Sequence, residues 1–245
     1  MLITGFPAGM FQTNCYIVAA EAGSEAVIID PGQDAAPRVR ELLAEHDLTP
    51  VAVLLTHGHL DHTWNATELC DEYSIPAYIH PADRPMLADP GLGIGRALGA
   101  MIGDQVFVEP QKVIDLVDGE PVTLAGITFG VDHAPGHSAG SIVFTVEAPA
   151  VDGAGAPVEG ETVTVAFDGD VLFQGSIGRT DLPGGSHEQL LGSIAAKLLP
   201  LRDDTVVLPG HGPATTIGRE RASNPFLQGL TGTETPGERK GRYGL

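Results

Sequence analysis

Residues 51–62 read Val-Ala-Val-Leu-Leu-Thr-His-Gly-His-Leu-Asp-His, an apolar run followed directly by four side chains that bind metals. The run Val51–Leu55 predicts a strand covered on both faces, because only such a strand is apolar at every position. The next residues, Thr56–His62, predict a polar loop, and a rigid strand aims such a loop in a fixed direction. We therefore expect the fold to present this loop at the end of a buried strand.

The loop supplies three imidazoles and one carboxylate, from His57, His59, Asp61 and His62. These ligand types suit borderline divalent ions, zinc first among them. His57 and His59 can converge on one ion, whereas Asp61 and His62 can reach a second. A chance gathering would explain one close pair among the nine histidines of the chain, but not three with an aspartate in this spacing.

Three further ligands follow other predicted strands. Asp170 follows Val163–Phe167, His211 follows Val206–Leu208, and His137 lies in a turn-rich segment of the second half. Each is preceded by glycine, which allows close backbone approach. Taken singly, each would more often be a structural residue. Together with the first cluster they complete a ligand set for two divalent ions.

The remaining pattern predicts an α/β fold with two sheets packed together and helices outside. In the first half, strands and helices alternate, at Val27–Ile29, Ala36–His46, Thr63–Tyr73 and Ala77–Ile79. Closely spaced strands in the second half predict an antiparallel meander, at Val113–Ile114, Val122–Leu124, Ile127–Val131, Ser141–Val146 and Val163–Phe167. Two helices follow, Ser186–Leu199 with Ser186 as its N-cap and Ile217–Ala222.

Residues 1–223 are expected to form a single domain, in which 148–161 is an exposed hairpin extension rich in Ala, Gly and Pro. Residues 224–245 are expected to form a partly mobile C-terminal tail. The segment Ala88–Pro110 allows two interpretations, a loop and helix packed on the core or a flexible lid over an apolar pocket.

The composition of the chain disfavours several classes of binding partner. The formal net charge of −19 disfavours nucleic acid and anionic membrane surfaces. The N-terminus lacks the features of a signal peptide, and no apolar run reaches the ~20 residues of a membrane span. Only two cysteines occur, Cys15 and Cys70, outside any CxxC pair. We therefore expect a cytoplasmic protein that acts on a small molecule. The sequence leaves its oligomeric state open.

The string His57-x-His59-x-Asp61-His62, followed in order by His137, Asp170 and His211, resembles the metallo-β-lactamase superfamily over roughly residues 10–215. Asp30-Pro31-Gly32 and Pro135-Gly136-His137-Ser138 resemble its flanking motifs. The resemblance implies a four-layer αβ/βα sandwich of two mixed sheets, with the metal site at one edge. It assigns His57, His59 and His137 to one ion, Asp61, His62 and His211 to the other, and Asp170 to a bridge.

The resemblance also implies a reaction, the attack of a metal-bridging hydroxide on a carbonyl that the second ion polarises. Asp61 is then the proton carrier, and zinc is the expected metal, with iron or manganese as alternatives. Asp30 and Asp168 are candidates to orient the ligand histidines. For His133 we expect a structural role.

Asp170 bears on the substrate, because thioester hydrolases of the glyoxalase II type carry a bridging aspartate that β-lactam-cleaving members usually lack. The segment Leu172–Asp181 resembles glyoxalase II-like proteins, in which a residue matching Arg179 contacts the thiol carrier. We therefore expect hydrolysis of a small thioester or ester. Glyoxalase II continues into a helical glutathione-binding domain, whereas 34 residues follow His211 here, so that mode of recognition is not expected.

Two other activities stay open. Arg179-Thr180-Asp181 also resembles persulfide dioxygenases, which bind one iron through residues matching His57, His137 and Asp170. A lactonase is the third interpretation.

Overall fold

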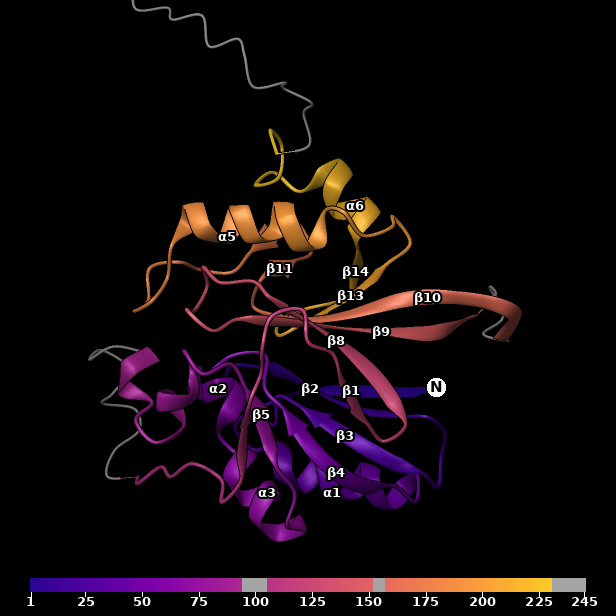
Figure 1. Ribbon diagram of the computed structural model, residues 1–245, viewed down its shortest axis with the longest axis vertical. Helices are drawn as coiled ribbons and strands as arrows, with labels where there is room; N and C mark the ends of the chain where they lie inside the picture. The colour runs from indigo at the N-terminus through magenta and orange to yellow at the C-terminus, as the bar shows by residue number, and fades with distance from the viewer. Residues whose placement is uncertain (94–104, 152–156, 231–245) are drawn as a thin grey trace, which may run out of the picture.

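Strands that are apolar on both faces need a layer on each side, and the chain supplies four layers (Figure 1). The computed structural model describes residues 1–93, 105–151 and 157–230. Helices α1 (Ala35–Glu45) and α3 (Ala66–Tyr73) cover the first sheet, and α5 (His187–Ser193) and α6 (Ile217–Ser223) cover the second. The expected αβ/βα sandwich is confirmed.

The first sheet has six strands in the order of the chain. They are β1 (Leu2–Ala8), β2 (Thr13–Ala19), β3 (Glu25–Ile29), β4 (Thr49–Leu54), β5 (Ala77–Ile79) and β6 (Val113–Asp115). The first three strands pair antiparallel, and β3 to β6 pair parallel. Because β3 and β4 are parallel, the residues that follow them meet at one edge of the sheet.

The second sheet has the strand order β14-β13-β10-β9-β8-β7. Its strands are β7 (Val122–Leu124), β8 (Ile127–His133), β9 (Ile142–Val151), β10 (Pro157–Gly169), β13 (Val206–Pro209) and β14 (Thr215–Thr216). The strands β7 to β10 form the predicted antiparallel meander, and β13 joins β10 in parallel. A short hairpin, β11 (Leu172–Phe173) and β12 (Ser176–Ile177), follows β10.

Short helical turns complete the fold: α2 (Leu60–Thr63), η1 (Arg84–Leu87) and η2 (Ile194–Leu198). The predicted N-cap of α5 is confirmed, since the Ser186 hydroxyl accepts a hydrogen bond from the Gln189 amide. The predicted helix continues beyond α5 as the wider turn η2, so its length is correct although its hydrogen-bond pattern changes.

Successive side chains of a strand point to opposite faces of its sheet, so each strand contributes to two separate parts of the core. On β3, Val27 and Ile29 pack between the two sheets, whereas Ile28 packs against the helices of the first layer. Phe144 and Phe167 reach the inter-sheet layer from the opposite side and are almost fully buried. This apolar layer locks the two sheets together, so the loops at their shared edge keep a fixed relative position.

Three details of the sequence prediction were wrong. Residues 113–115 leave the meander and pair with β5, because pairing partners far along the chain have no local signature. Asp61 and His62 lie on α2 rather than in a loop. The predicted helix Thr63–Tyr73 begins only at Ala66, because the Asn65 amide nitrogen donates to the Pro31 carbonyl and its side chain accepts from the Ala36 amide. The strands β1 and β2 were not predicted.

Other predictions reach beyond the described residues. β9 and β10 pair between Pro149 and Thr162, but residues 152–156 of the predicted hairpin extension lie outside the description. So do residues 94–104 of the possible lid and 231–245 of the predicted tail. The single-domain assignment of 1–223 stays a prediction. In the described parts of the chain, every helix is too short or too polar to cross a bilayer.

Truncation of a side chain in the inter-sheet layer should strongly lower the stability of the fold. We expect Phe144→Ala to lower the free energy of unfolding by about 3–5 kcal/mol, because it removes a buried ring and leaves a cavity. Urea unfolding followed by circular dichroism measures this. The control Val117→Ala truncates a side chain that is 50% exposed, and it should stay within about 0.5 kcal/mol of the wild type. Equal losses in both variants would contradict the assigned core.

Candidate metal centre

Each predicted ligand lies just beyond the carboxyl end of a strand, at one edge of the sandwich. His57 follows β4, His137 follows β8, Asp170 follows β10 and His211 follows β13. β8, β10 and β13 run in one direction, because β9 lies antiparallel between β8 and β10, and β13 is parallel to β10. The topology thus brings together ligands that are up to 154 positions apart in the sequence (211 − 57).

The first group, which we call the trio, consists of His57, His59 and His137. The His57 Nε2 atom lies 3.0 Å from His59 Nδ1 and 3.2 Å from His137 Nε2, and the last two atoms are 2.9 Å apart. All three side chains are buried. Three nitrogens in a triangle cannot satisfy one another with hydrogen bonds, because each carries either one proton or one lone pair.

The second group consists of Asp61, His62 and His211. The Asp61 Oδ2 atom lies 3.1 Å from His211 Nε2 and 3.5 Å from His62 Nε2. Thr13 donates its hydroxyl proton to the same oxygen over 3.0 Å. Asp61 and His62 share one turn of helix α2, which packs against β2.

Asp170 lies between the two groups. Its Oδ1 atom is 3.4 Å from His62 Nε2, and its Oδ2 atom is 3.6 Å from both His137 Nε2 and His211 Nε2. Each carboxylate oxygen therefore faces a ligand of the second group, and Oδ2 faces the trio as well. The arrangement has the geometry that a bridging ligand requires, and the bridging role itself stays a prediction.

Hydrogen bonds on the outer nitrogens turn the ring lone pairs inward. Asp30 Oδ2 lies 2.9 Å from His62 Nδ1 and accepts the Thr56 hydroxyl proton over 2.5 Å. Because that hydroxyl donates to Asp30, its oxygen can accept from His57 Nδ1, 3.1 Å away. Asp30 therefore holds the ring of His62, as expected of a residue that orients a predicted ligand.

Backbone carbonyls orient two more ligands. His137 Nδ1 lies 2.8 Å from the Arg179 carbonyl oxygen, and His211 Nδ1 lies 3.1 Å from the Phe11 carbonyl oxygen. Asp168, the other candidate for this role, does not perform it. Its Oδ2 atom accepts from the Leu172 amide, and within the described structure its Oδ1 atom has no hydrogen-bond partner, so that prediction was wrong.

Electrostatics prepare the site for cations. Burial, with the neighbouring histidines, lowers the pKa of His57 well below its usual range and lowers that of His59 to about 3. Their rings are therefore neutral and can donate lone pairs. Burial lowers the pKa of His62 too, but the carboxylates of Asp61, Asp170 and Asp30 outweigh it and raise that pKa. A proton on His62 thus balances charge that a metal would otherwise balance.

Several observations show that these residues fit two divalent ions. Ligands about 2.0–2.1 Å from a tetrahedral zinc lie about 3.3 Å from one another, close to the spacing of the trio. Buried ligand atoms without a hydrogen-bond partner in the described structure include His62 Nε2 and Asp170 Oδ1, both of which point into the second group. Such atoms are rare unless something else satisfies them.

A cavity of about 460 Å³ opens over the ligands. His59, Asp61, His137, Asp170 and His211 form its floor. Its walls are mainly apolar, from Met10, Phe11, Leu60, Trp64, Phe173, Ile177 and Leu182. Met10 and Phe11 are 62% and 38% exposed, so the chain between β1 and β2 forms an apolar rim.

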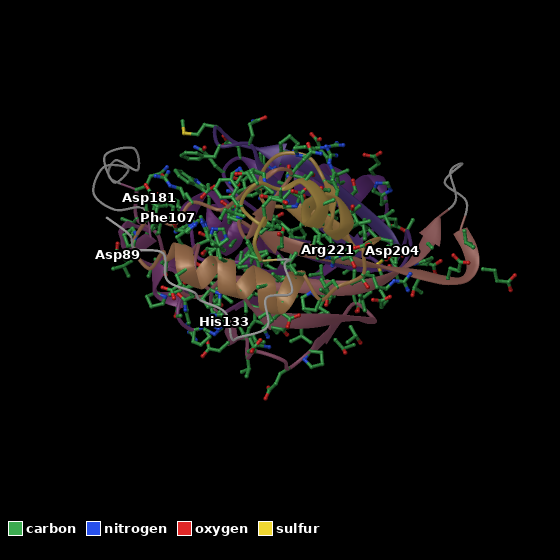
Figure 2. The ribbon with its side chains drawn as sticks, turned by 90° about the horizontal axis from the view of Figure 1, so that it is seen from above. Asp89, Phe107, His133, Asp181, Asp204 and Arg221 are labelled. Atoms are coloured by element: carbon green, nitrogen blue, oxygen red, sulfur yellow. The ribbon has the colours of Figure 1, made fainter. Side chains whose placement is uncertain are left out.

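Arg179 lines the same cavity, and its side chain is 58% exposed. Its guanidinium forms two hydrogen bonds of 2.8 Å with the carboxylate of Asp181. Figure 2 shows Asp181 on the opposite side of the molecule from Asp204. Whether Arg179 contacts a substrate stays a prediction.

Two other residues complete the account of the sequence predictions. His133 stacks on His80 with ring centres 4.0 Å apart and contacts the Ala139 carbonyl, which agrees with the structural role we expected. Sequence reasoning missed Thr13, which contacts Asp61. Thr13 begins a strand that was not predicted, so no local pattern marked it.

Comparisons with known proteins agree with this geometry. Residues 8–211 match the family model described as the metallo-beta-lactamase superfamily. An uncharacterized protein of Mycobacterium tuberculosis, Rv2581c, is 50% identical over 94% of this chain and 100% of its own length. The hydroxyacylglutathione hydrolase GloC of Haemophilus influenzae is 38% identical over 93% of this chain and 98% of its own length.

Two solved structures are also similar. The crystal structure of the BLEG-1 B3 metallo-beta-lactamase has a TM-score of 0.76 and 41% identity, over 92% of this chain and 99% of that one. The structure of TTHA1623 in a di-iron-bound form has a TM-score of 0.71 and 37% identity, over 91% of this chain and 100% of that one.

The geometry predicts two metal ions per chain. Protein loaded with zinc and freed of excess metal should hold about two ions by elemental analysis, and His211→Ala should hold about one, because only the second group loses a ligand. The control His187→Ala changes an exposed histidine outside the site and should leave both ions. One ion in the wild type, or two in His211→Ala, would contradict the two-group assignment.

Proposed function

The chain belongs to the metallo-beta-lactamase superfamily, and from this we propose that it is a hydrolase that cleaves a small thioester or ester with two divalent ions. Zinc is our first choice of metal, and the di-iron form of TTHA1623 makes iron the main alternative to it. The observation that carries the proposal is the position of Asp170 between the two ligand groups. With Asp170 between the two groups, both ions can lie close enough to act on the same substrate molecule.

Bound divalent ions lower the pKa of water and polarise a carbonyl oxygen, which is the chemistry that hydrolysis needs. The chain itself would carry a proton from the attacking water to the leaving thiolate or alkoxide. The Asp61 carboxylate lines the cavity and is 20% exposed, so solvent and substrate can both reach it. Thr13 and His211 contact its Oδ2 atom, and we therefore assign the proton to Oδ1.

The walls of the cavity favour a substrate with an apolar part. Aromatic rings of Phe11, Trp64 and Phe173 surround the floor, and Arg179 lies at the same opening. A thioester combines an activated carbonyl with an apolar sulfur, which suits such a cavity. GloC, which this chain covers along 98% of its length, bears the name hydroxyacylglutathione hydrolase, and this similarity supports a thioester in particular.

A reducing compartment such as the cytoplasm is part of the proposal. Cys15 and Cys70 are buried and unpaired, as small apolar side chains of the core would be.

A substrate screen on protein of known metal content tests the proposal. We expect turnover of S-lactoyl thioesters, and less of a lactone, a cephalosporin or a persulfide. If protein that holds one iron per chain consumes oxygen with the persulfide, the activity is that of a dioxygenase and not of a hydrolase. Dominant cephalosporin cleavage would instead support the activity named for BLEG-1.

Two variants locate the chemistry on thioesters. Asp61→Asn should lower kcat by about 10²–10⁴-fold if the carboxylate moves the proton. Asp170→Asn should also lower turnover, and turnover near that of the wild type would show that the bridging role is wrong. The control Asp204→Asn removes an exposed carboxylate that pairs with Arg202, and it should leave turnover unchanged.

Arg179 should affect binding rather than chemistry. For a thioester with an anionic thiol carrier, we expect Arg179→Gln to raise KM by up to about fivefold with kcat unchanged, because an exposed ion pair contributes little. Arg202→Gln is a matched control, since Arg202 pairs with Asp204 two residues away as Arg179 pairs with Asp181. A fall in kcat without a change in KM would assign Arg179 a different role.

A further inference from the structure

A fully buried carboxylate, Asp83, lies beside the ligand loops, and none of its hydrogen bonds in the described structure goes to a ligand ring. Its Oδ2 atom accepts hydrogen bonds from the Gly58 amide, over 2.9 Å, and from the Ser138 hydroxyl, over 2.6 Å. Its Oδ1 atom accepts from the Gly140 amide over 2.7 Å. Each of these contacts is a donor, so two oxygens that only accept fit the position fully.

The three donors come from loops of different sheets. Gly58 lies between His57 and His59, in the loop that follows β4 of the first sheet. Ser138 and Gly140 come one and three positions after His137, in the loop that follows β8 of the second sheet. One carboxylate therefore ties the two loops that together supply the trio.

The backbone of Asp83 is held in the turn that follows β5 of the first sheet. It lies between β5 and η1, where its amide donates to the His80 carbonyl and its carbonyl accepts from the Met86 amide. The carboxylate is thus a fixed point to which both loops are attached, rather than part of a flexible side chain.

The glycines beside Asp83 allow this close contact. A Cβ atom at Gly58 would lie 2.7 Å from the Asp83 carbonyl oxygen, and one at Gly140 would lie 2.7 Å from the Asp83 Cγ atom. Both distances are far below ordinary van der Waals contact. The backbones of the two ligand loops reach the carboxylate only because these positions lack side chains.

We propose that Asp83 is a positioning residue that sets the spacing between the His57–His59 pair and His137, and thereby the affinity of the trio for its metal ion. The inference rests on the metal site of the proposed function. The trio draws its nitrogens from two sheets, and three hydrogen bonds to one carboxylate fix the offset between them. Without these hydrogen bonds, the loops keep their ligands, but the spacing between the His57–His59 pair and His137 is no longer fixed.

Asp83→Asn is the direct test. An amide keeps one accepting oxygen and turns an NH₂ group toward at least one backbone N–H donor, so at least one of the three hydrogen bonds to the loops is lost. The measurement is made in the His211→Ala background, which isolates the trio, by zinc titration against a chromophoric chelator. We expect the dissociation constant for zinc to rise by about 10–100-fold, the range found when partners that orient metal ligands are removed.

Glu220→Gln is the matched control. Glu220 is also fully buried and accepts from neutral donors, the Gly175 amide, the Thr215 hydroxyl and the Asn224 side chain, but it orders the hairpin β11–β12 and not the histidine loops. It should lose thermal stability as Asp83→Asn does, with an unchanged dissociation constant for zinc. Equal weakening of zinc binding in both variants would overturn the inference.

Ser138→Ala provides a second test should Asp83→Asn not fold. It removes one of the three donors, and the dissociation constant should rise by less than about tenfold. Unchanged zinc binding in Asp83→Asn would overturn the role of Asp83 but not the metal site. If Asp83→Asn does not fold, unchanged zinc binding in Ser138→Ala would have the same meaning. Absence of zinc binding by the wild type would instead overturn the metal site.

Discussion

Three imidazole nitrogens that lie within 3.2 Å of one another in a buried site are the constraint on which the rest of this structure depends. Such a triangle leaves lone pairs without partners, and a protein interior does not tolerate that unless a cation satisfies them. Contacts on the outer ring nitrogens keep lone pairs inward: in the trio, the Thr56 hydroxyl faces His57 and the Arg179 carbonyl faces His137. Asp30 and the Phe11 carbonyl hold the rings of His62 and His211 in the second group in the same way.

The same constraint explains why carboxylates gather in a chain that is already strongly acidic. Asp61 and Asp170 extend the site beyond the trio, and with Asp30 they raise the pKa of His62 against the effect of burial. Buried negative charge on this scale is stable only beside positive charge. A divalent cation supplies that charge and removes the competition for a proton, which links metal binding to the stability of the site.

The two-sheet architecture turns this local chemistry into a functional site. Neither sheet contains the whole ligand set, so the inter-sheet core must hold the two edges at one separation while the loops meet above it. Asp83 fixes the spacing of the loops where they meet, and the apolar layer around Phe144 holds the two sheets together deeper in the fold. The cavity above the ligands has walls of aromatic and aliphatic side chains.

The sequence alone determined the features that are local in the chain. The apolar run before His57, the glycine before each later ligand and the close spacing of the meander strands are all patterns within a few residues. The string His57-x-His59-x-Asp61-His62 carries the resemblance that predicted the ligand set. The tertiary structure alone decided the contacts that join distant segments. Thr13 and Asp61 are 48 positions apart, and Asp83 and Gly140 are 57 apart. The pairing of β6 with β5 and the start of α3 at Ala66 belong to the same class, because each depends on which chain segments the core brings into contact and on no local preference of the residues involved.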